Sequence, residues 1–459
     1  MKELKILSPC GILGYGYPES SFLAGMEHHP DAIVVDAGST DAGPHKLGAG
    51  VAIVSRQACK KDLEIMILNG LRAGIPVVIG SAGGSGGRVH VEWTWSIIRE
   101  ILQENGYEDK KVAVVWGDIP KEVVAQRLAE GKVTPLGMAV PELTAERLER
   151  TTAVVAQMGH EPIVKALETG ADIILCGRAY DPSPFAAVAA FHGFNLAYGY
   201  HAGKILECAA LCAEPGTTKD CMLGTIREDG FVVTPLSSER RCTCTSVAAH
   251  TFYEKDHPYL LHGPGIVLDL EQCTFTQMED GRSVFVTGSR IHTTDPYYIK
   301  LEGAMQVAYR TFVVAGIRDP LLIGRLEEVE ALVEKQVRNY YKELPQDSFR
   351  IHFLNYGIDG VMGKLEPRRD DLPHEVGVVF EVLADSQERA NAICATVRST
   401  FLHYGYEGRK STAGNLAFPF APSDVPFGPV YEFSVYHLME VRDGCEMFPL
   451  EMRTGGDKE

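Results

Sequence analysis

The sequence predicts an α/β protein whose N-terminal part has a mostly parallel sheet with helices on both faces. Short apolar runs alternate with helical patterns over roughly the first 180 residues. The apolar runs are continuous rather than alternating, which is typical of strands buried on both faces. Glycine-rich polar segments follow most of these runs. An open doubly wound sheet and a TIM-like barrel both fit this pattern, and we favour the open sheet.

Each predicted element has a local signal. The predicted strands are residues 4–9, 32–39, 75–84, 111–118 and 171–179. Apolar residues recur at helical spacing in the segments between them, which are residues 63–71, 93–102 and 143–169. We therefore expect repeated strand–helix units in an α/β domain over residues 1–225.

The pattern changes after residue 225. Residues 226–345 are predicted to be a β-rich segment followed by a helix at 320–343, and they complete the main body. Residues 273–291 predict two strands joined by a turn at Asp280–Gly281. A smaller α+β domain is expected over residues 346–459, after a linker near Pro345. Its predicted elements are strands at 349–355, 375–384 and 431–441 and an amphipathic helix at 386–404.

Composition and charge argue against several classes of partner. The chain has 459 residues, with 61 acidic and 44 basic side chains and a formal net charge of −17. This excess of negative charge disfavours nucleic acid and anionic membranes. There is no apolar stretch of about 18 residues that would span a membrane, and the first residues lack the apolar core of a signal peptide. We therefore expect a cytoplasmic protein.

Eleven cysteines fit a reducing compartment with free thiols. Five of them lie close together in the sequence: Cys208, Cys212, Cys221, Cys242 and Cys244. A metal or iron–sulfur site is one interpretation of this group. The absence of a CxxC pair favours the other, that these are buried apolar cysteines.

The stretch "IPVVIGSAGGSGGRVH", residues 75–90, runs from a predicted strand into a glycine loop. It matches neither a Walker A loop nor the GxGxxG fingerprint, so the chain carries no ATP or NAD signature. Backbone N–H groups at the start of the next helix could still bind an anion. The alternative is a tight turn that lets helix and strand pack closely. The candidate substrate-binding residues here are Ser81, Gly83, Gly84, Ser85, Gly86, Gly87 and Arg88.

Polar residues also follow the second strand. Asp36 ends a buried apolar run, and Asp41 and His45 follow within ten residues. Asp36 and His45 could act as general acid or base, and Asp36 and Asp41 could bind a divalent metal ion. The alternative is that Asp36 caps a turn and the rest is a solvated loop.

Three later segments offer further candidates. Arg178, after the fifth strand, could bind a carboxylate or phosphate bidentately, with Asp181 beside it, or could instead form an ion pair. The segment 201–208 offers His201, Lys204 and Glu207 on a predicted helix. The segment 289–303 offers the catalytic candidate His292 and the binding candidate Asp295.

Four stretches together resemble one known family. They are "VVDAGSTDAGPHKLGAG", "VVIGSAGGSGG", "HAGKILECAA" and "GSRIHTTDPYYIKLEGA". In these residues and in their order, the chain is similar to the acyclic terpene utilisation AtuA family, from about residue 4 to residue 420. The resemblance implies a role in degrading branched acids and acyclic terpenes, often as CoA thioesters. It also implies a small ferredoxin-fold partner, fused or separate. It carries over no catalytic residue.

These observations predict a catabolic enzyme, a lyase of the hydratase/dehydratase type acting on a hydroxy acid or its CoA thioester. Gly83 to Gly87 and Arg178 would bind the anionic group of the substrate. Asp36 or His45 would be the base and His201 or His292 the acid, and a divalent metal could replace the acid. Two alternatives stay open: an isomerase or racemase, and a non-catalytic subunit that binds an acyl-CoA. We expect a homo-oligomer.

Overall fold

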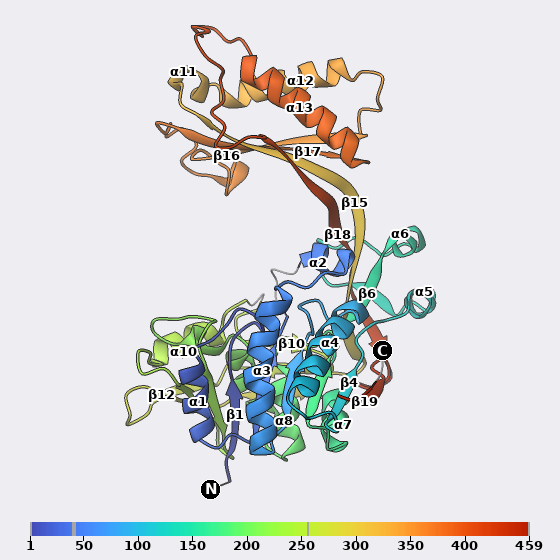
Figure 1. The fold of residues 1–459 in the computed structure, drawn as a ribbon, viewed down its shortest axis with the longest axis vertical. Helices are drawn as coiled ribbons and strands as arrows, with labels where there is room; N and C mark the ends of the chain where they lie inside the picture. Colours follow the sequence, from blue (N-terminus) through green and yellow to red (C-terminus); the bar gives the residue numbers. More distant parts are fainter. Residues whose placement is uncertain (1, 39–42, 255–256, 458–459) are drawn as a thin grey trace. The chain divides into compact units, whose positions relative to one another are not determined.

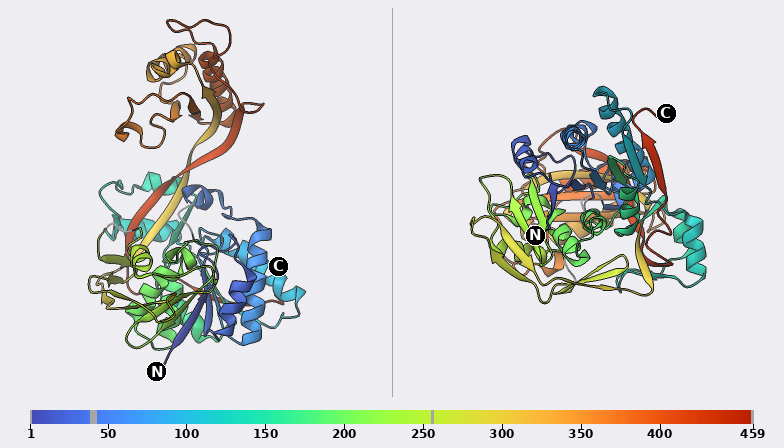
Figure 2. Two further views of the ribbon diagram at one scale, coloured as in Figure 1. Left: turned by 90° about the vertical axis from the view of Figure 1, so that its left-hand side faces the viewer. Right: turned by 90° about the horizontal axis from the view of Figure 1, so that it is seen from below.

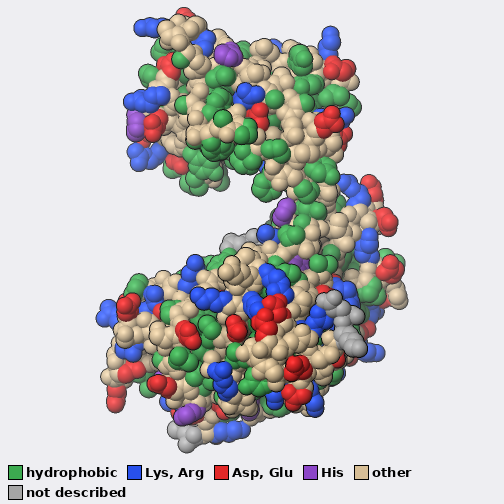
Figure 3. Space-filling model, viewed as in Figure 1, with side chains coloured by type: hydrophobic (Ala, Val, Ile, Leu, Met, Phe, Trp, Pro, Cys, Tyr) green, Lys and Arg blue, Asp and Glu red, His purple; other side chains and the backbone are tan. Residues whose placement is uncertain are grey.

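The chain forms two compact units. The computed structural model describes residues 2–38, 43–254 and 257–457. Unit 1 comprises residues 1–305 and 433–459, and unit 2 comprises residues 306–432. Within the described residues, no helix has both the length and the apolar character needed to cross a membrane. Basic and acidic side chains are interspersed on the face shown in Figure 3.

Two long strands carry the chain from one unit into the other. They are β15 (Tyr297–Ile317) and β18 (Asp424–Val441), and both can be followed in Figures 1 and 2. Unit 2 is therefore inserted between two segments of unit 1. The domain boundaries expected at residues 225 and 345 do not coincide with this division. The segment 226–305 belongs to unit 1, and Pro345 lies inside unit 2.

Unit 1 is built around one large sheet. Its ten strands among the described residues are, in sheet order, β12 (Thr274–Gln277), β13 (Val284–Thr287), β9 (Phe231–Pro235), β8 (Met222–Ile226), β1 (Leu4–Ser8), β2 (Ala32–Asp36), β3 (Val77–Gly80), β7 (Ile173–Cys176), β4 (Lys111–Val115) and β19 (Leu450–Thr454). The strands from β1 to β4 in this order pair in parallel. Antiparallel strands extend this parallel centre on both sides. The predicted α/β class, with its mostly parallel sheet, is confirmed.

Helices cover both faces of this sheet, as predicted. Side chains alternate along each central strand, so that Val34 packs into one core and Val35 into the other. The first core is covered by α5 (Lys121–Ala129), α7 (Glu161–Glu168), α8 (Ser183–Phe191) and α9 (Leu196–Leu206). The second is covered by α1 (Glu19–Glu27), α3 (Arg56–Ala73) and α4 (Arg88–Glu104). Helix α3 begins where the Ser55 side chain accepts a hydrogen bond from the Ala58 N–H and ends at Gly74, whose φ is 67°.

The segment 143–169 was predicted to be a helix with a break in it, but in the structure it also contains a strand. It contains α6 (Ala145–Arg150), the strand β6 (Ala153–Ala156) and then α7. Strand β6 pairs antiparallel with β15, where Leu301 lies opposite Ala156. A short strand, β5 (Val133–Pro135), pairs in the same way with β18. Both strands depend on partners far away in the sequence, so local periodicity does not indicate them.

The middle of the chain is rich in strands, as expected. The predicted hairpin is formed by β12 and β13, which pair antiparallel. Its turn is closed by Asp280, whose carboxylate accepts the N–H groups of Arg282 and Ser283. The remaining elements of unit 1 are α2 (Gly43–Ala49), a 3₁₀ turn η2 (Ala209–Cys212), α10 (Cys244–Thr251), β10 (Leu260–Gly263), β11 (Ile266–Asp269) and β14 (Arg290–Thr293).

Unit 2 combines strands and helices, and it includes the predicted strands at 349–355 and 375–384 and the predicted helix at 386–404. Strands β16 (Phe349–Tyr356) and β17 (Val376–Ala384) pair antiparallel with each other, and β17 pairs with the distal half of β15. The helices α12 (Leu326–Tyr340) and α13 (Gln387–His403) lie on one face of these strands (Figure 1) and share a core with them. Short turns, α11 (Pro320–Ile323) and η3 (Gly363–Leu365), complete the unit.

Candidate functional site

The glycine loop after β3 packs closely against the backbone of the loop after β7. Gly86 has a φ of 65°, and a Cβ atom there would lie 2.2 Å from the backbone nitrogen of Arg178. The Arg178 N–H donates to the Gly86 carbonyl at 3.1 Å. Only glycine allows both the conformation and this approach. The loop after β3 and the loop after β7 are therefore held together as one structure.

The other predicted loop residues have different surroundings. Gly83 faces His90, and Gly87 precedes the first residue of α4. The Arg88 N–H at the start of α4 donates to the Asp118 carboxylate at 2.8 Å, so a protein carboxylate already caps this helix. The exposed Arg88 side chain lies 4.0 Å above the Trp116 ring.

Gly84 and Ser85 line a cavity of about 180 Å³ that lies within unit 1. It is formed by α2, the glycine loop, the loop after β7, the start of β15 and the end of β18. The lining residues are Gly43, Leu47, Gly84, Ser85, Arg178, Asp181, Lys300, Glu302, Phe433 and Tyr436. The predicted glycine loop and two predicted side chains, Arg178 and Asp181, thus meet at this cavity.

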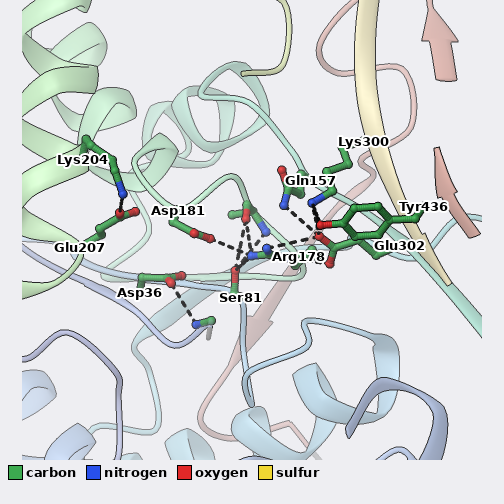
Figure 4. Close-up of polar contacts among 12 residues, drawn as sticks. Asp36, Ser81, Gln157, Arg178, Asp181, Lys204, Glu207, Lys300, Glu302 and Tyr436 are labelled. Atoms are coloured by element: carbon green, nitrogen blue, oxygen red, sulfur yellow. Dashed lines mark hydrogen bonds and ion pairs between the residues drawn. The ribbon is translucent and has the colours of Figure 1, made fainter. Parts of the chain in front are cut away.

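Arg178 is the centre of the polar contacts in this cavity (Figure 4). Its Nε atom donates to Glu302 Oε2 at 3.0 Å. Its Nη1 atom donates to Ser81 Oγ at 3.0 Å, to the Ala179 carbonyl at 2.7 Å and to Asp181 Oδ1 at 2.8 Å. Ser81 is fully buried and has a φ of 49°, unusual for a residue other than glycine, and these bonds hold it there. The guanidinium group is thereby fixed in one orientation.

Glu302 joins Arg178 to a second cation. Lys300 Nζ lies 3.2 Å from Glu302 Oε1 and donates to the Tyr436 hydroxyl at 2.7 Å. Gln157 Nε2 also donates to Glu302 Oε1, at 3.0 Å. Burial alone would raise the pKa of Glu302, but the charges of Arg178 and Lys300 outweigh it and lower the pKa to about 2. Glu302 is therefore a carboxylate at any ordinary pH.

Glu302 and Tyr436 are not among the site residues that we predicted from the sequence. Lys300 and Glu302 are two residues apart on β15, a spacing that puts both side chains on one face of a strand. That signal was present in the sequence. Tyr436 comes from β18, more than a hundred residues later, and no local pattern connects it with β15.

Asp36 ends strand β2 and is almost completely buried. Its Oδ2 atom accepts the Gly38 N–H at 3.1 Å, whereas Oδ1 has no hydrogen-bond partner among the described residues. Burial, with the negative charge of Asp181 as the next contribution, raises the pKa of Asp36 well above its usual value. The predicted turn-capping contact exists, and one oxygen of the same carboxyl group is left without a partner.

Lys204 on α9 and Glu207, the residue directly after this helix, form a buried ion pair 2.6 Å apart. Burial raises the pKa of Glu207 to about 7, against the opposing charge of Lys204. In the part of the chain that the structure describes, the Oε2 atom of Glu207 has no hydrogen-bond partner. Figure 4 shows Asp181 between this pair and Arg178, and the charge of Asp181 contributes to the raised pKa of both Glu207 and Asp36.

The histidine candidates do not line this cavity. His201 is fully buried, and its ring nitrogens bond to Ser289 Oγ at 2.7 Å and Thr251 Oγ1 at 3.0 Å. His292 is exposed and lies 3.6 Å from Asp269. His45 is half-buried on α2.

Of the two remaining acidic candidates, only one lies among the described residues. Asp295 is exposed in the turn before β15, and Asp41 lies outside the described residues. Within residues 2–38, 43–254 and 257–457, no group of three or more histidine, cysteine or acidic side chains is arranged to hold a metal ion. A metal on Asp36 and Asp41 stays a prediction.

The cysteines of the 208–244 segment include one close pair. The sulfur atoms of Cys212 and Cys242 are 4.0 Å apart, and both side chains are buried. The described cysteines are free thiols. The burial of Cys212, Cys221 and Cys242 agrees with their interpretation as apolar core residues.

The fold and the cavity define an α/β protein with a pocket at the carboxyl ends of parallel strands, lined by two cations and two carboxylates. Its family follows from comparison with known proteins. A model of the family described as "Acyclic terpene utilisation family protein AtuA" matches residues 56–420, and the chain belongs to this family. The family's description suggests a role in the catabolism of acyclic compounds. No curated protein and no solved structure matches the chain.

Proposed function

We propose that this protein is a lyase of the hydratase/dehydratase type that acts on a hydroxycarboxylic acid or its CoA thioester. The observation that carries the proposal is the buried guanidinium of Arg178 in a small cavity that also contains Lys300 and Ser85. Family membership supports the catabolic part of the proposal. The geometry of the donors and the two buried carboxyl groups support the rest.

The cavity offers hydrogen-bond donors that the protein does not use fully. The Nη2 atom of Arg178 makes only a 3.5 Å contact with Glu302. Lys300 Nζ has three N–H groups and contacts Tyr436 and Glu302. Ser85 Oγ is buried and has no hydrogen-bond partner within residues 2–38, 43–254 and 257–457. These three groups come from three separate loops and strands, and they suit a carboxylate or a polarised carbonyl oxygen.

Loss of water from a hydroxy acid requires a base and an acid. The base takes the proton from the carbon beside the carbonyl group, the C–C double bond forms as the C–O bond breaks, and the acid protonates the leaving hydroxyl group to give water. Burial raises the pKa of Glu207 to about 7, which is near the working range of an acid or a base at neutral pH, and burial also raises the pKa of Asp36. Asp36 is one of the predicted bases, and Glu207 lies in the predicted segment 201–208.

The volume of the cavity limits the substrate. About 180 Å³ suits an acid of a few carbon atoms, and the nucleotide part of a CoA thioester would have to remain outside. We propose that the acyl part alone enters this pocket. A homo-oligomer and a small partner subunit remain proposals.

The test is an assay of the purified protein with a panel of short hydroxy acids and their CoA thioesters in D₂O. Formation of an unsaturated product, seen by its ultraviolet absorbance, would support the lyase. An Arg178→Lys variant should lose most of this activity, because lysine keeps the charge but not the fork of donors. Deuterium exchange beside the carbonyl group without loss of water would favour an isomerase. Binding of the same acids without exchange or product would favour a carrier subunit and would overturn the proposal.

A further inference from the structure

The outermost strand of the large sheet, β19, has one side open to another strand. It ends the ten-strand order, and among the described residues no strand pairs with its outer side. Figures 1 and 2 show it at the margin of unit 1. The outer side of such a strand presents backbone N–H and C=O groups to which another strand can bond. The residues of β19 indicate which strand fits there.

The ladder with β4 fixes which backbone groups of β19 point outward. The Trp116 N–H donates to the Pro449 carbonyl at 3.0 Å, and the same register continues along both strands. Hydrogen-bonded pairs alternate with non-bonded pairs along an antiparallel ladder, so every second residue from Pro449 onward bonds towards β4. The N–H and C=O groups of Leu450, Met452 and Thr454 therefore point to the outer side.

The open part of this edge is centred on Met452. At one end, the Thr454 N–H donates to the Asp457 carboxylate at 2.8 Å, which agrees with its direction away from β4. Met452 is 45 % and Leu450 38 % exposed, although both side chains are apolar. A groove of about 660 Å³ lies between α4 and β19 and is lined by residues of both. This groove leaves room on the α4 side of the edge for the side chains of a second strand.

The charges of β19 are complementary to those of a second copy of the same strand. Charged residues on an edge strand usually prevent pairing. Here one acid and one base, Glu451 and Arg453, lie on the same face on either side of Met452. If two copies pair antiparallel with Met452 opposite Met452, Glu451 of each copy lies opposite Arg453 of the other. Because the Met452 pair is hydrogen-bonded, these charged pairs are of the non-bonded type, in which the side chains are closest.

Other registers between two copies of β19 bring like charges together. Outward-pointing groups can pair only with outward-pointing groups, so the smallest shift of register is two residues. A shift in one direction places Glu451 opposite Glu451, and a shift in the other places Arg453 opposite Arg453. Like charges directly opposite each other destabilise a strand pair. The strand therefore specifies one register for pairing with itself.

Arg453 can join this contact without losing its bonds within the chain. Its Nη1 and Nη2 atoms donate to the two carboxylate oxygens of Glu92 at 2.7 Å and 2.9 Å, and its Nε atom donates to Glu451 at 2.8 Å. Among the described residues, these bonds account for three of the five N–H groups of a guanidinium. Two N–H groups are left for Glu451 of a second copy, on a side chain that is already held in place.

We propose that two copies of this protein associate by antiparallel pairing of β19, with Met452 at the two-fold axis and Glu451 of each copy opposite Arg453 of the other. The pairing joins the two large sheets into one and covers the exposed side chains of Leu450 and Met452. It is independent of the reaction proposed above. A strand of five residues makes a small interface, so we expect a dissociation constant in the micromolar range.

The first test is sedimentation velocity of the full-length protein from about 1 to 100 µM. The wild type should shift from the 50.2 kDa of one chain to twice this mass. Met452→Pro should raise the dissociation constant about 10-fold or more, because it removes the two central N–H donors. It leaves the ladder with β4 intact, since this N–H points away from β4. Met452→Ala keeps the N–H and is the matched control, and circular dichroism checks that both variants fold.

A charge exchange tests the register. Glu451→Arg places arginine opposite Arg453 in a dimer of that variant, and Arg453→Glu places glutamate opposite Glu451 in its own dimer. Each variant alone should associate about 10-fold more weakly than the wild type. An equimolar mixture should regain association, because both contacts then join opposite charges. Loss of bonds within a chain does not produce this recovery.

A cysteine substitution tests the position of the axis. In a hydrogen-bonded antiparallel pair the Cα atoms are about 5.5 Å apart, which suits a disulfide. Met452→Cys should therefore form a covalent dimer with oxidised glutathione, the oxidant in this experiment. The wild type measures the background from the native cysteines. Thr276→Cys is the matched control, because Thr276 is an exposed residue of β12, the strand at the opposite end of the same sheet.

Four results would overturn the inference. A wild type that remains monomeric at about 100 µM would leave β19 without a second copy as its partner. A dimer that Met452→Pro does not weaken would use another surface. Failure of the two folded charge variants to associate when mixed would exclude the register. Equal cross-linking of Met452→Cys and Thr276→Cys would show that the disulfide forms by random collision.

Discussion

The Nε atom of Arg178 lies 3.0 Å from Oε2 of Glu302, and both side chains are nearly enclosed. The negative charge of Glu302 balances the positive charge of the Arg178 guanidinium. Removal of the Glu302 carboxylate therefore leaves the Arg178 charge without a partner in a poorly solvated place. We expect Glu302→Ala to lower the free energy of unfolding by about 3 kcal/mol or more, measured by urea denaturation. Glu3→Ala removes the partner of Arg227 at the surface and should cost less than about 1 kcal/mol. Equal losses would contradict a buried, compensated pair.

Gly86 should tolerate no side chain. In Gly86→Ala the new Cβ would collide with the backbone of Arg178 at 2.2 Å, and the residue would keep a φ of 65°. We expect a loss of about 3 kcal/mol or more, or failure to fold. Gly106→Ala is the control, because Gly106 has a φ of 74° and no atom near the Cβ position. It should cost only the strain of the backbone, about 1 kcal/mol. A thermal melt compares the two, and similar melting temperatures would refute the close packing of the two loops.

Glu330 should make unit 2 less stable as the pH rises. Burial raises its pKa to about 8. The folded state therefore holds a proton that the unfolded state, with its ordinary pKa of about 4.5, has released. The contribution of Glu330 to the free energy of unfolding is highest below pH 4.5. It falls as the pH rises from 4.5 to about 8, and above that pH it stays constant. Glu330→Gln should remove this fall and be more stable than the wild type at pH 8, by on the order of 2 kcal/mol.

Hydrogen exchange of the amides of α12 and α13, corrected for the intrinsic effect of pH, gives the measurement for unit 2. The control is the same comparison at pH 4.5, where the wild type and the Glu330→Gln variant should differ little. A difference that does not change between pH 4.5 and pH 8 would show that Glu330 does not titrate in this range.

Lys300 and Tyr436 should both contribute to the binding of short carboxylic acids, and Lys300 should contribute more. Lys300→Met removes a cation from the cavity, and we expect affinity for short carboxylic acids to fall about 10-fold, the range for a charge-assisted hydrogen bond. Tyr436→Phe removes the hydroxyl that accepts from Lys300 at 2.7 Å and should have a smaller effect, about threefold. Titration calorimetry with butyrate measures both. A larger loss in Tyr436→Phe would mean that the hydroxyl group, rather than the ammonium group, contacts the acid.

The parallel centre of the fold could be predicted because each strand is encoded locally. The runs containing Val34, Val78 and Ile174 are apolar on both sides, and the segments between them have helical periodicity. The hairpin at Asp280 has an equally local signal. In contrast, β6 and β5 are short segments that become strands only because β15 and β18 pass beside them.

The candidate site could be predicted only in part, for the same reason. Arg178 follows a buried parallel strand, and ligands bind where such strands end. Glu302 and Tyr436 complete the cavity from strands whose approach to Arg178 is a long-range property. His201 illustrates the opposite case, since a histidine within three residues of a lysine looked catalytic but bonds to Ser289 and Thr251 in the core.

The insertion of unit 2 has a consequence for synthesis on the ribosome. Chain segments emerge in sequence order, and compact parts fold as they become complete. Residues 306–432 are synthesised before Phe433 and Tyr436, which line the cavity, and before β19, which pairs with β4. The nascent chain therefore carries a finished unit 2 while the cavity of unit 1 still lacks a wall. The cavity is completed late in translation, when the segment made after unit 2 joins the part of unit 1 made before it.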